Sequence, residues 1–362
     1  MIETRAPGKL FVAGEYAVVE PGQPAVLVAV DRYITVRLSE SCDVGRIHSS
    51  EYGKAPLVWV REAEGNSIVV DHRPTDYVLS AIDVVEELRA EIGTPPRYFD
   101  LDISSELDDA SGRKFGLGSS GAVTTATIAA LDEFYTLGLT RTERFKLALL
   151  ATIAVAPNAS CGDIAASTFG GWIRFTSPDR EALGLHRQVH GVASALACRE
   201  WEGSGANRLT PPDSLQLLVG WTGSPASTER LVKRVRIPGT AAPQPYESFT
   251  ADSRACVDAL VASFEADDGS ALECIRRARR LLQRLGTASG SQIETEQLRS
   301  LCDIAETYGA AAKPSGAGGG DCGIALSEAD LPTIDILREW ERHGIQRLSL
   351  SPHRAEGGID EF

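Results

Sequence analysis

Short apolar runs broken by proline–glycine turns open the chain and predict β-strands. Apolar residues fill Leu10–Val12 and Ala25–Val30, and apolar and polar positions alternate over Ile34–Leu38. Further short strands are predicted at 57–60, 67–70 and 99–103, with one helix between them over 77–91, where apolar residues recur at helical spacing. This order of elements is typical of an α+β fold.

The middle of the chain predicts two packed helices. Residues 120–135 and 142–155 both show helical periodicity, and Thr140 with Glu143 forms a capping box before the second helix. Pro157 ends that helix, because proline cannot continue the hydrogen-bond ladder. The polar turn that follows, before the next apolar stretch, is therefore a candidate functional segment.

The composition changes near residues 205–213, which hold glycine, serine and two consecutive prolines. We place a domain boundary there and predict an N-terminal domain over 1–208 and a C-terminal domain over 209–362. For the second domain the pattern predicts helices at 227–236, 249–264, 270–285, 293–308 and 332–343, and strands at 215–221, 310–313, 322–326 and 346–350.

Composition and charge narrow the function. The 362 residues are 43% hydrophobic, enough for a core in each of two domains, and the formal net charge of −14 disfavours nucleic acid or an anionic membrane as a partner. Seven cysteines without a C-x-x-C pair fit reduced thiols in the cytoplasm. The longest apolar run, near 147–156, is too short to span a bilayer. We therefore expect a cytoplasmic protein whose anionic ligands are held by local positive sites.

Three glycine-rich motifs can supply such sites. They span residues 6–19, 114–123 and 313–323. Glycine permits backbone conformations closed to other residues, and a helix that starts directly after such a loop offers free amides and a positive dipole end to a phosphate. Only six residues are lysine, against thirty arginines, yet Lys9, Lys114 and Lys313 each lie in one motif. For the second motif alone, a tight turn with a serine N-cap is the structural alternative.

These motifs, in this order and at this spacing, resemble the GHMP kinase superfamily of galactokinase, homoserine kinase, mevalonate kinase and phosphomevalonate kinase. The similarity spans the whole chain. Tyr16 stands where a mevalonate kinase usually has histidine, and Asp321 where it has a small residue, so the chain looks like the bacterial phosphomevalonate kinases. The resemblance implies an α+β, two-domain fold with an N-terminal ribosomal-protein-S5-like domain and a C-terminal ferredoxin-like domain.

The activity implied by this resemblance is transfer of the γ-phosphoryl group of ATP to 5-phosphomevalonate, which gives 5-diphosphomevalonate and ADP in isoprenoid synthesis. Alternatives are mevalonate kinase or another small-molecule kinase of the superfamily, the related diphosphomevalonate decarboxylase, and a catalytically silent sensor with the same fold. Tyr16 and Asp321 argue against mevalonate kinase, and Lys9, Ser120 and Asp163 together argue against the sensor.

The resemblance also implies which residues bind ATP and its metal. The ATP-binding residues are Lys114, Gly116, Leu117, Gly118, Ser119, Ser120 and Gly121. The Ser120 hydroxyl is the expected protein ligand of Mg²⁺, which prefers oxygen and keeps several waters. Several relatives carry a second, acidic ligand where this chain has Leu149–Thr152, which contains no acid. Water or another residue would complete the metal's coordination here.

Lys9 and Asp163 are the implied catalytic residues. Phosphoryl transfer needs positioning and charge neutralisation more than covalent chemistry. We expect Lys9 to face the transferring phosphate, and Asp163 to orient Lys9 and the acceptor. The structural alternatives are a solvated surface lysine and an N-cap of the following helix.

The acceptor pocket is implied to be lined by Lys9, Asn158, Ser160, Thr228, Ala317 and Gly318. The polar members can hydrogen-bond a carboxylate, a hydroxyl and a phosphate. Ser227 and Thr228 could equally cap the next helix, and Arg73 is a further candidate for binding an anion. Asp321 is expected to orient the third loop rather than touch substrate.

Two other patterns have plainer interpretations. His186 and His190 have the i,i+4 spacing of metal ligands, but without a nearby glutamate or third ligand in the sequence they favour two surface histidines. The basic run Arg276–Arg280 favours one solvated helix face.

Overall fold

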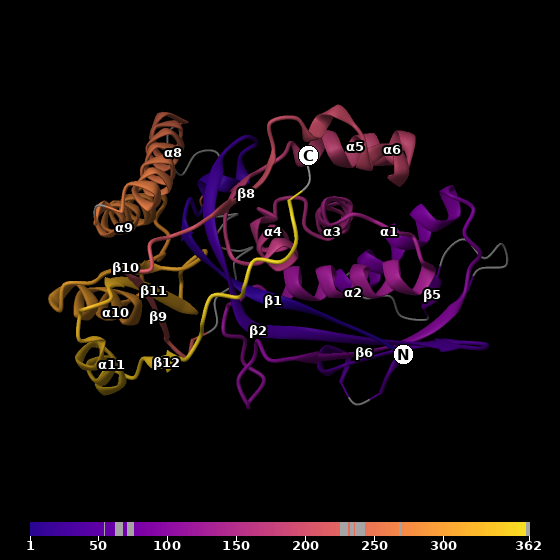
Figure 1. Cartoon of the computed structure of the whole chain (residues 1–362), viewed down its shortest axis with the longest axis horizontal. Helices are drawn as coiled ribbons and strands as arrows, with labels where there is room; N and C mark the ends of the chain where they lie inside the picture. Colours follow the sequence, from indigo (N-terminus) through magenta and orange to yellow (C-terminus); the bar gives the residue numbers. More distant parts are fainter. Residues whose placement is uncertain are drawn as a thin grey trace.

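Two β-sheets, each covered by helices, organise the chain (Figure 1). The computed structural model describes residues 1–53, 55–61, 68–70, 76–224, 231, 235, 243–267 and 269–359. An eight-stranded sheet lies in the N-terminal part and a four-stranded sheet in the C-terminal part, and the chain passes from one to the other between Leu209 and Leu215. Across these described ranges, every helix is too short or too polar to cross a membrane.

A long antiparallel hairpin of β1 (Ile2–Ala13) and β2 (Pro24–Ser41) forms the centre of the large sheet. Its strand order is β5-β4-β3-β6-β2-β7-β8, with β1 paired to β2. The register shifts between Pro7 and Gly8, which marks a bulge. The other strands are β3 (Gly45–Ser49), β4 (Leu57–Arg61), β5 (Ile68–Val70), β6 (Tyr98–Ser105), β7 (Trp172–Thr176) and β8 (Gly205–Leu209).

Helices cover one face of this sheet (Figure 1), and α2 and α4 pack directly on β1 and β2. The predicted capping box is confirmed, because Thr140 accepts from the Glu143 amide and Glu143 accepts from the Thr140 amide. The helices are α1 (Tyr77–Glu91), α2 (Ser119–Tyr135), α3 (Arg141–Val155), α4 (Gly162–Phe169), α5 (Arg180–His190) and α6 (Val192–Leu196), with short turns of 3₁₀-helix at η1 (Ala17–Val19), η2 (Ser50–Tyr52) and η3 (Arg199–Trp201).

The apolar pattern does not predict α5. Only Arg180 and Leu183 are buried in this helix, whereas Leu185 and Val189 are exposed, so no apolar stripe marks it in the sequence. Its N-cap is Asp179, whose side chain accepts from the Ala182 amide. The helix ends at a glycine bend, and α6 follows it directly.

The small sheet has the order β10-β11-β9-β12. Helices α9 and α10 pack against β10, α8 lies along α9, and α11 contacts α10 and β12. The elements are β9 (Leu215–Trp221), α8 (Pro243–Ala266), α9 (Ser270–Ser289), α10 (Glu296–Thr307), β10 (Ala311–Pro314), β11 (Cys322–Glu328), α11 (Thr333–Arg342) and β12 (Gln346–Leu348). Of the helix predicted at 227–236, the structure describes only residues 231 and 235, and both are helical.

After β12 the chain returns to the large sheet (Figure 1). The His353 amide donates to the Ala29 carbonyl at 2.8 Å, and the Gly171 amide donates to the His353 carbonyl at 2.9 Å. Pro352 forms a bridge to Val30. The last residues of the chain therefore contribute to the N-terminal layer, although their sequence position places them after the second sheet.

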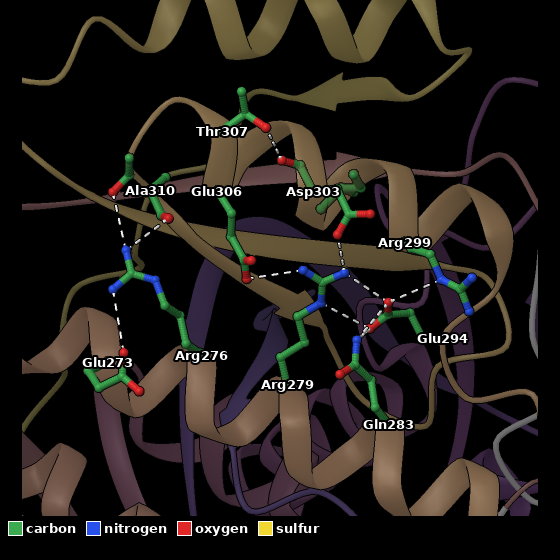
Figure 2. A network of polar contacts seen from close by, with 12 residues as sticks. Glu273, Arg276, Arg279, Gln283, Glu294, Arg299, Asp303, Glu306, Thr307 and Ala310 are labelled. Carbon is green, nitrogen blue, oxygen red and sulfur yellow. Dashed lines mark hydrogen bonds and ion pairs between the residues drawn. The ribbon is translucent and has the colours of Figure 1, made fainter.

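The expectation of a solvated basic face over Arg276–Arg280 is wrong for Arg279. Figure 2 shows its guanidinium among carboxylates from the segment before α10 and from α10 itself, at 2.9 Å from Glu294, 2.5 Å from Asp303 and 3.1 Å from Glu306. The Arg279 side chain is only 7% exposed. Burial acts to lower the pKa of Arg279, but the hydrogen bonds and ion pairs outweigh it and the pKa rises. The cluster fastens α9 to α10.

Candidate active site

A cavity of about 440 Å³ opens where four segments distant in sequence meet. They are β1 with the turn after it, the loop before α2, the turn between α3 and α4, and the loop between β10 and β11. Tyr77 at the start of α1 and Leu107 after β6 add to the wall. Its lining residues include Lys9, Phe11, Glu15, Tyr16, Tyr77, Lys114, Gly116, Leu117, Gly118, Ser119, Ser120, Asn158, Ser160, Asp163, Ser315, Gly316, Ala317 and Asp321. All three glycine-rich motifs of the sequence therefore reach one cavity.

The loop before α2 presents backbone to this cavity. Gly116 and Gly118 both have a positive φ, and Gly118 is the left-handed N-cap of α2. The first amide to donate within the helix is that of Ala122, to the Gly118 carbonyl. The amides of Ser119 and Ser120 precede it and have no intrahelical acceptor. With the helix dipole, this end of α2 is suited to bind an anion.

Of the predicted ATP-binding residues, Gly121 and Lys114 lie apart from the others. Gly121 sits behind the loop, where a Cβ would lie 2.8 Å from Cγ of Asp163, so glycine permits the carboxylate to approach. Lys114 lines the cavity, but its side chain is 54% exposed and pairs with Glu51 at 2.9 Å. Its charge is thus partly neutralised at the cavity edge.

Lys9 projects from β1 and is held against the loop. Its amide donates to the Leu117 carbonyl at 2.8 Å, and its Nζ donates to the Gly116 carbonyl at 3.2 Å. The residue is 8% exposed. Burial lowers the pKa of Lys9, and the carboxylates of Asp163 and Asp321 oppose that shift. The alternative of a solvated surface lysine is wrong.

Asp163 lies in the first turn of α4, one residue beyond its start. The N-cap of α4 is Cys161, in a left-handed conformation, so the alternative of Asp163 as an N-cap is wrong. Its carboxylate accepts from the Ile164 amide at 3.1 Å and from the Ser120 hydroxyl at 3.5 Å. Burial raises the pKa of Asp163, and Lys9 opposes that rise.

Gly118 is what lets Lys9 and Asp163 converge. A Cβ on Gly118 would lie 2.8 Å from Cε of Lys9 and 3.4 Å from Cβ of Asp163. A side chain here would collide with the Lys9 side chain and contact that of Asp163. The glycine therefore serves both the loop backbone and the pair of charges behind it.

Ser315, the first small residue of the loop between β10 and β11, is tied to β1. Its hydroxyl accepts from the Phe11 amide at 2.9 Å and donates to the Phe11 carbonyl at 3.0 Å. The Tyr16 hydroxyl donates to the Ala317 carbonyl at 2.5 Å. Tyr16, singled out in the sequence for its identity alone, thus bridges the first and third motifs.

Gly318 does not belong to the cavity lining. A Cβ there would lie 2.1 Å from the Ile293 carbonyl oxygen, so its positive φ and missing side chain allow close packing behind the loop. Asp321 does line the cavity, and Gly116 packs against its side chain. This contact is compatible with the predicted loop-orienting role of Asp321.

Lys313 is not presented to the cavity. Its residue is fully buried, and its Nζ forms an ion pair with the Glu15 carboxylate and donates to the Pro314 carbonyl at 2.6 Å. Sequence reasoning grouped Lys313 with the phosphate-friendly lysines and assigned no role to Glu15. The available signal was an acidic residue in the turn that directly follows the apolar strand β1.

Arg180 is a further residue that sequence reasoning missed. From the start of α5 its guanidinium donates to the Ala159 carbonyl at 2.9 Å and to the Val19 carbonyl. Both acceptors line the cavity, as do the predicted Asn158 and Ser160. No local sequence pattern marks Arg180, because the carbonyls that it binds lie in turns distant along the chain. The predicted Ser227, Thr228 and Arg73 lie outside the described residues.

The oxygen donors present fit a magnesium ion. The Ser120 hydroxyl and the Asp163 carboxylate lie 3.5 Å apart beside the N-terminus of α2, where phosphate oxygens would add further hard ligands. The Glu15 carboxylate is instead engaged by Lys313. The Ser120 hydroxyl, with the Asp163 carboxylate behind it, is therefore the group best suited to bind the metal.

Comparison with known proteins places these features in a family. The model of the GHMP kinases N terminal domain matches residues 76–171, and that of the GHMP kinases C terminal matches residues 261–346. The phosphomevalonate kinase of Streptomyces sp. (strain CL190) is 47% identical, over 97% of both chains. The mevalonate kinase of Pyrococcus abyssi is 28% identical, over 90% of this chain and 89% of that protein.

Solved structures agree with this placement. The chain is similar to the Streptococcus pneumoniae phosphomevalonate kinase in complex with phosphomevalonate and AMPPNP, with a TM-score of 0.85, 30% identity, and coverage of 97% of this chain and 100% of that one. It is also similar to the Lin0012 protein of Listeria innocua, with a TM-score of 0.91, 35% identity and coverage of 98% of both chains.

Proposed function

The chain belongs to the GHMP kinase family, and from that premise we propose that it is a phosphomevalonate kinase. It transfers the γ-phosphoryl group of ATP to (R)-5-phosphomevalonate, giving 5-diphosphomevalonate and ADP. The observation that carries this assignment is 47% identity to a phosphomevalonate kinase over 97% of the chain, against 28% to the mevalonate kinase compared above. We infer a cytoplasmic location from the use of ATP and from the free thiols.

We propose that the loop before α2 holds the ATP phosphates. The amides of Ser119 and Ser120 lie in the first turn of α2, at the helix end that borders the cavity, where amides have no intrahelical acceptor. Gly116 and Gly118 let the backbone approach a phosphate closely. Ser120 would hold Mg²⁺ together with phosphate oxygens and water, and the ion would neutralise charge on the phosphates.

The acceptor needs little help to lose a proton. A phosphate monoester has its second pKa near 6 and is mostly dianionic at pH 7. The obstacle is the approach of two anionic phosphates. Lys9 offsets that repulsion, because its ammonium group is buried at the cavity wall and its one hydrogen-bond acceptor identified there is the neutral Gly116 carbonyl.

Asp163 positions the groups that react. Its carboxylate lies near Lys9 and within reach of the Ser120 hydroxyl, so it can hold the ammonium group and the metal-binding serine in one geometry. Asn158, Ser160, Ala317 and the third loop complete the acceptor side of the cavity. Thr228 remains a proposed acceptor residue on the basis of the family resemblance, whereas Gly318 packs against Ile293 behind the loop and supports it.

Substrate choice tests the assignment. Release of ADP should require Mg²⁺ and 5-phosphomevalonate, and kcat/KM for mevalonate should be about 10⁴-fold lower, because a site built to pair a phosphate is left with unpaired polar groups. A coupled assay comparing 5-phosphomevalonate, mevalonate, homoserine and galactose measures this. Equal turnover of mevalonate and 5-phosphomevalonate would refute the assignment.

A further inference from the structure

A cluster of metal-binding side chains lies outside the catalytic cavity. His186 in α5, Cys198 after α6 and Glu200 in η3 bring one potential ligand atom each to within 4.8 Å of one another. The sequence showed only His186 and His190, because the other two ligands come from a separate turn that the fold returns to α5. The third ligand and the glutamate that were missing from the sequence pattern are thus present in space.

The distance between two of the potential ligand atoms already matches that between neighbouring ligands of a bound zinc ion. His186 Nδ1 lies 3.5 Å from Glu200 Oε1. Zinc bond lengths of about 2.0–2.3 Å in a tetrahedron place neighbouring ligand atoms roughly 3.3–3.8 Å apart. The Cys198 Sγ donates to the Ala195 carbonyl at 3.2 Å and also interacts with the Glu200 carboxylate, so the thiol already faces a second member of the cluster.

Two further features favour a preformed metal site. His186 Nε2 lies 2.9 Å from the Ser194 hydroxyl, which leaves Nδ1 free to coordinate and supplies the outer hydrogen bond that orients ligating histidines. Glu200 Oε2 is buried and has no hydrogen-bond partner of normal geometry among the described residues. The Glu200 carboxylate as a whole is approached by Cys198 and His186, the two side chains that would share a metal ion with it.

We propose that His186, Cys198 and Glu200 bind one Zn²⁺ ion, with water in the fourth position. Nitrogen, sulfur and carboxylate donors together suit Zn²⁺ better than the hard cation Mg²⁺. The histidine and glutamate side chains are 20% and 23% exposed, so an ion can enter from solvent. The ion would clamp η3 to α5 and is independent of the catalytic magnesium.

Zinc binding is measured by equilibrium dialysis of the chelator-stripped full chain in a phosphine reductant. Wild type should bind one Zn²⁺ at this site. Ser194→Ala should lower the zinc affinity by about tenfold. Cys198→Ser and Glu200→Gln should weaken it more, because they remove direct ligands. His190→Gln and Cys42→Ser serve as matched controls that should leave zinc affinity unchanged. His190 lies beside His186 but outside the group of three ligands, and Cys42 is exposed elsewhere.

Cobalt substitution identifies the ligand directly. Co²⁺ bound to wild type and to His190→Gln should show thiolate-to-cobalt charge-transfer absorption. Cys198→Ser should abolish this absorption. The metal-free Cys198→Ser protein should unfold at the same temperature as metal-free wild type, which shows that the variant is folded. Loss of binding in His190→Gln with retention in Cys198→Ser would assign the metal to the helical histidine pair and overturn the proposal. Loss only in Asp163→Asn would place the ion in the catalytic cavity and overturn it equally.

Discussion

Lys9 in β1 and Lys313 in β10 are both withdrawn from solvent, at 8% and 0% exposure, and both belong to glycine-rich motifs. Their partners differ. Lys313 is paired with the Glu15 carboxylate, whereas the Nζ of Lys9 donates to the neutral Gly116 carbonyl and faces a cavity. Asp163 acts on Lys9 through its charge. We infer that the same residue type stabilises the fold in one region and is placed to offer its charge to a ligand in the other.

We infer from this difference that a buried charge is available to a ligand when the opposite charges around it compensate it only in part. The Lys313–Glu15 pair joins the first motif to the strand before the third, and so supports the cavity from behind. The Arg279 cluster follows the same rule as Lys313, with three carboxylates around one guanidinium (Figure 2). In Lys9, by contrast, burial outweighs the nearby carboxylates and the pKa falls.

Breaking the structural pair should give the largest loss of stability. Lys313→Met leaves the Glu15 carboxylate buried without its partner, which should lower the free energy of unfolding by about 3–5 kcal/mol. Urea denaturation measures this. The matched control is the double variant Glu15→Gln/Lys313→Met, which removes both charges and should recover much of the loss. A Lys313→Met variant as stable as wild type would contradict the structural role of this pair.

The next largest effect is expected in the loop before α2, where Gly118 packs against Lys9 and Asp163. Gly118→Val forces a β-branched side chain into a positive φ and against Lys9, so ATP affinity should fall at least about tenfold, equal to about 1.4 kcal/mol. Calorimetric titration of the folded variant measures this. Gly138→Val is the control, because Gly138 also has a positive φ but nothing lies within 4 Å of its added Cβ. Unchanged ATP affinity in Gly118→Val would remove the loop from the nucleotide site.

The incomplete compensation of Lys9 should also appear in the pH profile. Because burial lowers the pKa of Lys9, kcat/KM should fall with rising pH earlier than for an ordinary lysine. Because burial raises the pKa of Asp163, activity should be lost on the acid side at a higher pH than for an ordinary aspartate. Lys9→Arg keeps its charge at all accessible pH and should shift only the alkaline limb upward. An alkaline limb unchanged in Lys9→Arg would exclude Lys9 as its origin.

The sequence predicts the parts of this molecule that depend on local rules. The capping box at Thr140, the glycine loop that opens α2 and the strands of the first motif all follow from neighbouring residues. The sequence motifs also name Lys9 and Asp163, which the fold places on either side of Gly118. Local pattern and family resemblance therefore identified most of the cavity lining.

Contacts made between distant segments could not be predicted in this way. The burial of Arg279 and Lys313 depends on carboxylates that other elements supply, and Arg180 acts on turns far away in the chain. His186 in α5 looked unpartnered because Cys198 and Glu200 follow α6 in a separate turn that the fold brings back to it. The division at 208 and 209 remains a proposal, since the segment around Pro352 returns to the first sheet.

The most direct test of the account compares kcat in Lys9→Met and Asp163→Asn, with 5-phosphomevalonate saturating and folding verified by urea denaturation. Lys9→Met should lose roughly 10²–10³-fold in kcat, as expected for removal of one electrostatic donor, and should cost less stability than Lys313→Met. Asp163→Asn should lose less kcat than Lys9→Met, because the dianionic acceptor needs little general base. A nearly silent Lys9→Met beside a severely impaired Asp163→Asn would make the aspartate the principal catalyst and contradict the account.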